Sequence, residues 1–196
     1  MDGVVIKMEN RLQALLDAEK QVYFGDKPIK FDYKFRKKMN YEIYKYISLL
    51  RKYEYCCKKR DESNGLIASK LWVTRVKVYD RLKNKLGMQL GIEINPGFTK
   101  QGLRICHQNV IINGYVGEYC TFHGNNVIGN KRTGASDAVP KIGSHVDIGV
   151  GAMIIGDVEI ADNCIIGAGA VVTKSFNKPG TIIAGVPAKE INLEKE

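Results

Sequence analysis

The sequence lacks the features of a secreted or membrane-spanning protein. Its five cysteines contain no CxxC pair and no even-numbered framework, which is typical of a chain kept in a reducing compartment. No long apolar run follows Met1, so we expect neither a signal peptide nor a transmembrane span. These absences predict a cytoplasmic protein.

Acidic residues are outnumbered only in the first part of the chain. Residues 1–90 hold 21 Lys and Arg against 11 Asp and Glu, whereas residues 91–196 hold 9 and 10, so the net charge of +9 comes from the first part. We therefore expect a basic domain over residues 1–90, a second domain over 91–191 and a tail over 192–196.

Apolar spacing in the basic domain predicts helices, separated by breaks at Gly25–Pro28 and Ser63–Gly65. They run over residues 8–24, about 31–60, and 66–86, with Gly87 ending the last in C-cap fashion. No nucleic-acid-binding motif is present. The basic residues of this domain have three possible roles. They form a solvated face, contact an anionic membrane surface or contact an acidic glycan, and we favour the two contacts slightly.

A six-residue repeat runs without a slip from Ile142 to Lys174. An aliphatic residue stands at every sixth position, and a small or β-branched residue follows four places later: Val146, Ala152, Val158, Cys164 and Ala170. Neither a helix nor an ordinary strand demands a period of six. A hexapeptide repeat is the signature of a β-helix, in which about eighteen residues complete one triangular coil.

The repeat domain begins before its most regular part, near Ile92. A second register of Val110, Val116, Phe122 and Ile128 precedes the long one, and Val110 to Ile128 spans one full coil. The polar stretch Asn130–Pro140 predicts a loop between coils, where function often lies. The predicted fold is α+β, an N-terminal α-helical segment followed by a C-terminal parallel β-helix.

With these repeats and the closing motifs Val171–Phe176 and Ile182–Lys189, residues 92–191 resemble the left-handed β-helix acyltransferases, also called hexapeptide-repeat transferases. The closing motifs are typical of serine acetyltransferases and of O-acetyltransferases in surface-polysaccharide pathways. The resemblance implies direct transfer of an acetyl group from acetyl-CoA, a co-substrate, to an acceptor hydroxyl, with no bound cofactor or metal. It also implies a homotrimer or a pair of trimers, with the donor bound between subunits.

The resemblance places the general base at His107, since imidazole takes a hydroxyl proton readily near neutral pH. Glu93 stands where the family has the carboxylate that orients this base. His123 follows His107 by sixteen residues, near one coil length, and either lines the acceptor pocket or is the base itself. Cys106 and Asn109 are further candidates for acceptor contact.

Two positions that bind serine in the family differ here. Cys106 replaces the Asp before the base, and Val139 replaces a histidine before Pro140-Lys-Ile142. We therefore predict a sugar hydroxyl of a surface polysaccharide or its precursor as acceptor, with L-serine of cysteine biosynthesis as the alternative.

The donor side is predicted from charge and from the resemblance. Lys and Arg suit the phosphates of coenzyme A, and the candidates are Lys131, Arg132, Lys174 and Lys189. The positions that match the family's pantetheine contacts are Gly151, Ala152, Ala168 and Gly169.

Two other classes of protein are alternatives to the acyltransferase. Gamma-type carbonic anhydrases hold zinc with three histidines on the same fold. Here the three histidines are spaced by 16 and 22 residues, unlike that family's close pair, and the closing motifs favour the transferase. A non-catalytic β-helix scaffold is the third class.

Overall fold

The computed structural model describes residues 2–26, 29, 38–131 and 138–191, with side chains inside the first helix described from Asn10 onward. The chain separates into two compact units, Met1–Leu90 and Gly91–Glu196. This boundary coincides with the one drawn from the sequence, while the expected tail over 192–196 lies outside the described residues.

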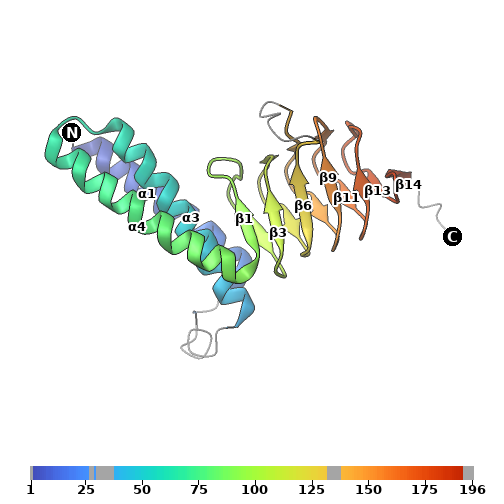
Figure 1. The fold of residues 1–196 in the computed structure, drawn as a ribbon, viewed down its shortest axis with the longest axis horizontal. Helices are drawn as coiled ribbons and strands as arrows, with labels where there is room; N and C mark the ends of the chain where they lie inside the picture. Colours follow the sequence, from blue (N-terminus) through green and yellow to red (C-terminus); the bar gives the residue numbers. More distant parts are fainter. Residues whose placement is uncertain (1, 27–28, 30–37, 132–137, 192–196) are drawn as a thin grey trace. The chain divides into compact units, whose positions relative to one another are not determined.

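The first unit contains three helices, α1 (Asp2–Phe24), α3 (Met39–Glu62) and α4 (Leu66–Leu90) (Figure 1). Helix α3 packs against both of the others. It contributes the most deeply buried apolar side chains, which are Ile43, Tyr46, Ile47 and Leu50. The predicted helices are present, although α1 begins before residue 8 and residues 31–37 of the second prediction lie outside the described part.

The last helix does not end at Gly87, as the sequence predicted. Helix α4 continues to Leu90 because Leu86 and Leu90, one turn apart, are both buried. The left-handed residue is Gly91 instead, with φ 65°. A Cβ at Gly91 would also collide with the side chain of Asn109, so glycine is required there on two grounds.

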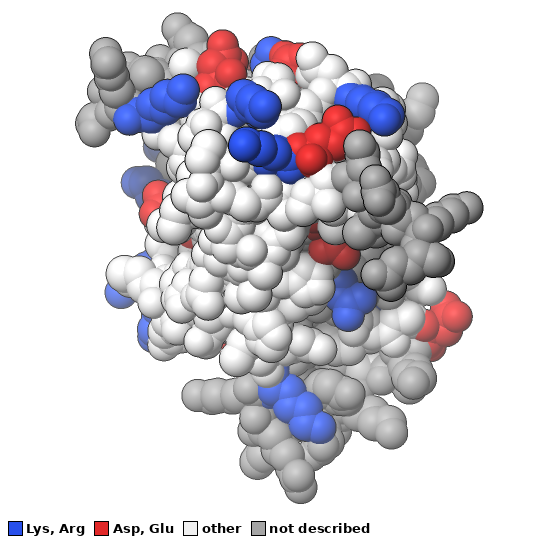
Figure 2. Space-filling view, turned by 90° about the vertical axis from the view of Figure 1, so that its right-hand side faces the viewer, with Lys and Arg blue, Asp and Glu red and all other residues white. Residues whose placement is uncertain are grey.

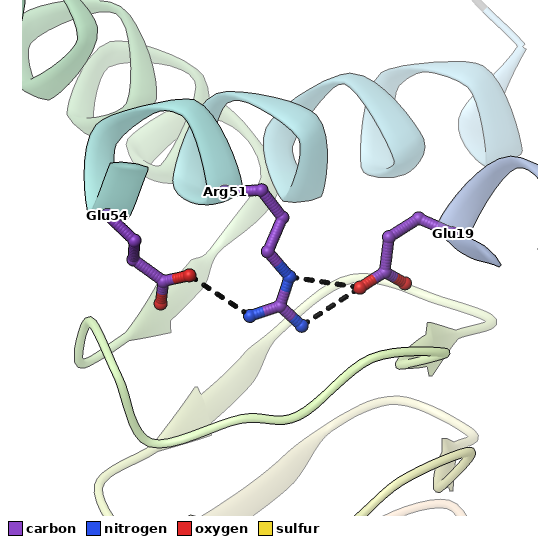
Figure 3. Close-up of polar contacts among 3 residues, drawn as sticks. All are labelled: Glu19, Arg51 and Glu54. Atoms are coloured by element: carbon purple, nitrogen blue, oxygen red, sulfur yellow. Dashed lines mark hydrogen bonds and ion pairs between the residues drawn. The ribbon is translucent and has the colours of Figure 1, made fainter. Parts of the chain in front are cut away.

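A buried ion pair joins α1 to α3 (Figure 3). Arg51 donates from Nε and Nη2 to Glu19 Oε1 at 3.0 and 2.9 Å, and from Nη1 to Glu54 Oε2 at 3.2 Å. The Arg51 and Glu19 side chains are 2% and 0% exposed. Two charges taken out of water are tolerated only when they are paired, and without Glu19 the buried Arg51 would keep only the partly exposed Glu54 carboxylate.

The second unit is a β-helix built from short strands in three sheets. The first sheet holds β1 (Ile92–Ile94), β3 (Val110–Ile112), β6 (Asn126–Gly129), β9 (Met153–Ile155) and β12 (Val171–Val172). The second holds β4 (Tyr115–Val116), β7 (Lys141–Ile142) and β10 (Glu159–Ile160). The third holds β2 (Arg104–Ile105), β5 (Thr121–Phe122), β8 (Asp147–Ile148), β11 (Ile165–Ile166), β13 (Ile182–Ala184) and β14 (Lys189–Ile191). The described strands pair in parallel except β13 and β14, which are antiparallel.

The six-residue repeat places its aliphatic residues inside the coil, as predicted. Residues one coil apart stack, and Ile148 pairs with Ile166 eighteen residues later. The repeat's inward aliphatic residues are at most 5% exposed, and they are Ile142, Ile148, Ile154, Ile160, Ile166 and Val172. The small residues beside the corners, from Val146 to Ala170, are equally buried.

The coils do not all hold eighteen residues, and near the end Ile165 pairs with Ile182, seventeen residues later. Val110 pairs with Asn126, sixteen residues later, so the neighbour of Ile128 is Ile112 rather than Val110, as a full coil from 110 to 128 would require. Val127 pairs with Met153, twenty-six residues later. The excess falls in the predicted loop over 130–140, of which residues 132–137 lie outside the described part.

The outer faces of the sheets differ in polarity. On the outer face of the first sheet, Glu93 of β1 is followed by an apolar column of Ile111, Val127, Met153 and Val171, in which Ile111 and Met153 are each 42% exposed. The second sheet presents instead the ion pair Lys141–Glu159. Figure 2 faces the side where the last coils lie, and most of the described surface in its centre is formed by residues other than Lys, Arg, Asp and Glu. None of the described helices is long and apolar enough to cross a membrane.

The buried ion pair makes a stability prediction. We expect Glu19→Gln to lower the free energy of unfolding of the helical unit by about 1.5–3 kcal/mol, because buried Arg51 loses the charged partner of two hydrogen bonds and keeps only the partly exposed Glu54 carboxylate. Urea unfolding followed by far-ultraviolet circular dichroism measures this. Glu62→Gln is the control, since its pair with Lys58 is exposed and should change stability by less than about 1 kcal/mol. Equal, small effects would contradict the burial of Arg51.

Candidate active site

Two of the three histidines face one groove of about 550 Å³. The residues that line it are His107, His123, Asp147, Gly149, Val150, Ile165, Ile166, Gly167 and Ala168. Most of these residues lie in or directly after strands β2, β5, β8 and β11 of the third sheet. The groove therefore runs along the corner where the coil leaves the third sheet for the first.

His123 has a carboxylate partner that the sequence analysis missed. Its Nε2 lies 2.7 Å from Asp147 Oδ1. Phe122 pairs with Ile148 across the sheet, so His123 stands opposite Gly149 and reaches back diagonally to Asp147. An ionised carboxylate only accepts hydrogen bonds, so it keeps the proton on Nε2 and leaves a lone pair on Nδ1.

His107 stands on the preceding coil, next to His123. A Cβ at Gly124 would lie 2.7 Å from the Cβ of His107, and Gly124 has φ 113°. Glycine at 124 therefore lets His107 approach the coil that carries His123. Among the described residues, the His107 side chain has no hydrogen-bond partner.

Glu93, the predicted partner of His107, lies on the outer face of β1 in the first sheet, where its side chain is exposed. Within the described part of the chain it forms no hydrogen bond or ion pair. The structure thus brings together His107, His123 and Asp147, and does not join Glu93 to them.

A buried amide, also absent from the sequence prediction, fixes the backbone of the groove. Asn126 is fully buried and accepts a hydrogen bond from the Gly124 N–H at 2.9 Å. Its Nδ2 donates to the carbonyls of Gly149 at 2.8 Å and Ala152 at 3.3 Å. One side chain therefore ties the glycine behind His107 to the glycine that lines the groove on the next coil.

The other predicted acceptor contacts lie beside the groove rather than in it. Asn109 donates to the Asn125 side chain at 3.0 Å, in a stack of amides at the corner. Cys106 is half-buried, and Val139 is only 5% exposed. Neither Cys106 nor Val139 lines the groove.

No thiol is available in the groove as a nucleophile. Cys120 points into the coil and donates from Sγ to the Gly143 carbonyl at 3.1 Å. Burial raises the pKa of the Cys120 thiol to about 11, so it stays protonated at neutral pH. Among the described residues that line the groove, the groups that can act as a base are the His107 and His123 imidazoles and the Asp147 carboxylate.

Of the predicted pantetheine contacts, Ala168 lines the groove and Gly151, Ala152 and Gly169 lie at the same corner. The amides of the latter three already donate within the β-helix, to Gly124, Gly149 and Val150. Their N–H groups therefore already form hydrogen bonds within the β-helix. This leaves the Ala168 N–H as the candidate hydrogen-bond donor to a ligand in the groove.

The predicted phosphate-binding lysines lie away from the histidines. Lys174 extends over the Phe176 ring at 5.4 Å, and Lys189 is exposed on β14. The stem of Lys131 covers Gly156. Arg132 lies outside the described residues.

The third histidine is elsewhere. The His145 ring stacks on Tyr119, with ring centroids 5.5 Å apart. In the described part of the chain, no group of three or more His, Cys, Asp or Glu side chains is arranged to hold a metal ion.

Comparisons with known proteins agree with the repeat. Residues 140–174 match the family model "Bacterial transferase hexapeptide (six repeats)". Serine acetyltransferase of Synechococcus elongatus is 32% identical over 130 residues, which are 64% of this chain and 53% of that protein. Serine acetyltransferase of Staphylococcus epidermidis is 34% identical over 139 residues, which are 66% of this chain and 62% of that protein.

Solved structures share the fold. Serine acetyltransferase of Neisseria gonorrhoeae in complex with serine superposes with a TM-score of 0.68 at 23% identity, over 93% of this chain and 70% of that one. The soybean apoenzyme gives 0.67 at 20% identity, over 92% and 69%.

The chain thus carries the hexapeptide repeat over residues 140–174 and is similar to serine acetyltransferases over 64–66% of its length. Its second unit is a left-handed parallel β-helix, as the sequence predicted. The chain spans about half the length of the curated relatives that it matches, so their activity and substrates are not transferred to it by likeness alone.

The role of Asn126 in this hexapeptide-repeat protein can be tested. Asn126→Ala leaves the Gly124 N–H without a buried partner and removes one of the two hydrogen bonds to the Gly149 carbonyl, which should destabilise the β-helix by about 1–3 kcal/mol. Thermal unfolding measures the loss. Asn177→Ala is the control, because Asn177 is exposed and should change stability by less than about 0.5 kcal/mol. Equal stability of the two variants would contradict this role.

Proposed function

We propose that this chain is an acetyl-CoA-dependent O-acetyltransferase that passes the acetyl group directly to an acceptor hydroxyl. The observation that carries the proposal is the groove, in which His107 and His123 from adjacent coils face the same space. A thioester carbonyl is attacked by a hydroxyl once a base removes its proton, and imidazole suits this step. The likeness to serine acetyltransferases supports the same chemistry.

The comparisons support L-serine as the acceptor better than the sugar hydroxyl predicted first. The relatives and solved structures described above are all named serine acetyltransferases. A sugar acceptor finds no support among them. Cys106 and Val139 still lack the polar groups that the family resemblance places there, so other residues must hold a charged acceptor.

Within the groove we assign the base to His107 and the acceptor side to His123. The family resemblance points to His107, and its ring has no other hydrogen-bond commitment among the described residues. Glu93 as its orienting partner stays a prediction. The proton passes from the acceptor hydroxyl to the ring as the oxygen bonds to the acetyl carbon, and the thiolate of coenzyme A leaves.

The donor is proposed to bind between two subunits of a homotrimer or a pair of trimers. The apolar column on the first sheet, with Ile111 and Met153 exposed, suits a contact with another copy because burial of apolar surface drives association. Lys174 and Lys189 would meet the phosphates. A contact of the basic domain with an anionic membrane or glycan stays a prediction, which vesicle or glycan binding assays can test.

The activity is tested with purified protein, acetyl-CoA and a thiol-release assay. We expect acetylation of L-serine, with a kcat/KM in the ordinary enzyme range of about 10⁴ M⁻¹s⁻¹ or above. Neutral hexoses serve as the competing acceptors. Faster turnover of a sugar would restore the first prediction, and thiol release without acetylated product would contradict the transferase.

The same assay includes His107→Asn, which should lose about 10²–10⁴ in kcat because no base remains for the hydroxyl proton. His145→Asn is the matched control, since that ring lies outside the groove and should leave kcat nearly unchanged. If His123→Asn abolishes turnover while His107→Asn does not, the base is His123.

Lys174 tests the donor side. Lys174→Ala should raise the KM for acetyl-CoA roughly tenfold, because a charge-assisted hydrogen bond contributes about 1.5–3 kcal/mol. Lys100→Ala, an exposed lysine in the first coil, is the control. An unchanged KM would remove Lys174 from the site, and a monomeric mass by light scattering would remove the donor site between subunits.

A further inference from the structure

The acceptor end of the groove is dominated by one acidic side chain. Asp147 stands on the outer face of β8, between Thr121 of β5 and Ile165 of β11. Among the described residues that line the groove, it is the single Asp, Glu, Lys or Arg. The only hydrogen-bond partner of its carboxylate within the described part of the chain is the His123 ring, at 2.7 Å.

The Asp147–His123 pair presents acceptors to the groove. With Nε2–H committed to the carboxylate, the ring offers the lone pair of Nδ1, and the carboxylate keeps further lone pairs. The two side chains are 52% and 44% exposed, so a ligand can reach both. A site of this kind favours groups that donate hydrogen bonds, and its negative charge favours an ammonium over a neutral hydroxyl.

Positions 106 and 139, which bind serine in the family that the sequence resembles, cannot bind a charged group of an amino-acid acceptor here. Val139 is apolar and 5% exposed, and Cys106 lies outside the groove lining. We propose that Asp147, with His123 held beside it, binds the ammonium group of a hydroxy amino acid acceptor such as L-serine. This inference rests on the proposed function.

The placement suits the chemistry of such an acceptor. Serine carries its ammonium and hydroxyl on adjacent carbons, so the two groups must meet protein partners that lie close together. Strands of successive coils are about 4.7–4.9 Å apart. His107 follows β2 and His123 follows β5, which are paired strands, and Gly124 brings the Cβ of His107 against the second coil. Asp147 stands on β8, two strands from β2, but its carboxylate lies 2.7 Å from the ring of His123 on the coil between them. The partners of the ammonium and of the hydroxyl therefore both border the coil that carries His123, where one small molecule can lie between them.

The test compares two acceptors that differ in the ammonium alone. L-serine and 3-hydroxypropanoate share the hydroxyl and the carboxylate, and their ratio of kcat/KM isolates the ammonium contact. Asp147→Asn keeps the shape and removes the charge. We expect the wild type to prefer serine, and Asp147→Asn to lower the ratio about tenfold or more, mainly through KM for serine.

The control and the contrary outcomes are defined by the same ratio. Asp157→Asn, an exposed acid that does not line the groove, should leave the ratio unchanged. An equal loss for both acceptors in Asp147→Asn would mean that Asp147 is merely structural. An unchanged ratio, or a wild type that acetylates only neutral sugars, would overturn the proposal.

A binding measurement separates this proposal from the proposed function. In a ¹⁵N-labelled protein, titration with L-serine should shift the His123 ring signals in the wild type and not in Asp147→Asn, whether or not any acetyl group is transferred. Shifts without turnover would leave the acceptor site standing and reject the transferase. Equal shifts in both proteins, or none in the wild type, would reject the ammonium contact.

Discussion

The register between successive coils places every side chain of the candidate site. One inward aliphatic residue per six, each stacked on its equivalent one coil away, allows a single alignment of the parallel strands, because a slip of one residue would turn the buried set outward. His107, His123 and Asp147 follow or lie on β2, β5 and β8, three neighbours in one sheet. Their proximity is therefore a consequence of the apolar core, to which none of them contributes.

The corners between sheets are the weak points of such a scaffold, and polar side chains stabilise them here. A coil that changes direction exposes backbone groups that no strand pairs, and an unpaired buried group costs about 1–3 kcal/mol. Asn126 is the described partner of the Gly124 N–H at the corner of the groove, and it adds a second hydrogen bond to the carbonyls of Gly149 and Ala152. Asn109 and Asn125 adopt left-handed φ of 62° and 54°, which Asn tolerates better than most residues, and their side chains bond to each other. The same side chains therefore stabilise the turn and shape the groove.

The sequence predicted those features that depend on local period, and missed those that depend on distances between coils. The hexad fixed the β-helix and its inward residues, and the two groove histidines were recognised as candidates. The end of α4 was wrong at Gly87, because burial of Leu90 extends the helix to the next glycine. Asp147 was missed because 24 residues separate it from His123, more than a regular coil, and the loop between them hides the register. A strand alignment that removes this loop would have placed Asp147 beside Thr121.

Exposure limits what the groove of a single chain can do. An ion pair between half-exposed groups contributes at most about 1 kcal/mol, because water screens it. The Asp147 and His123 side chains are 52% and 44% exposed, so an acceptor bound there in one chain would be held weakly. The groove borders the first sheet, whose apolar column is suited to contact with another copy. In the proposed trimer, a neighbouring subunit on that sheet would exclude water from the groove and strengthen each charged contact within it. Recognition of the acceptor then depends on assembly of the trimer. This dependence explains how a site with a single carboxylate could still select a charged acceptor.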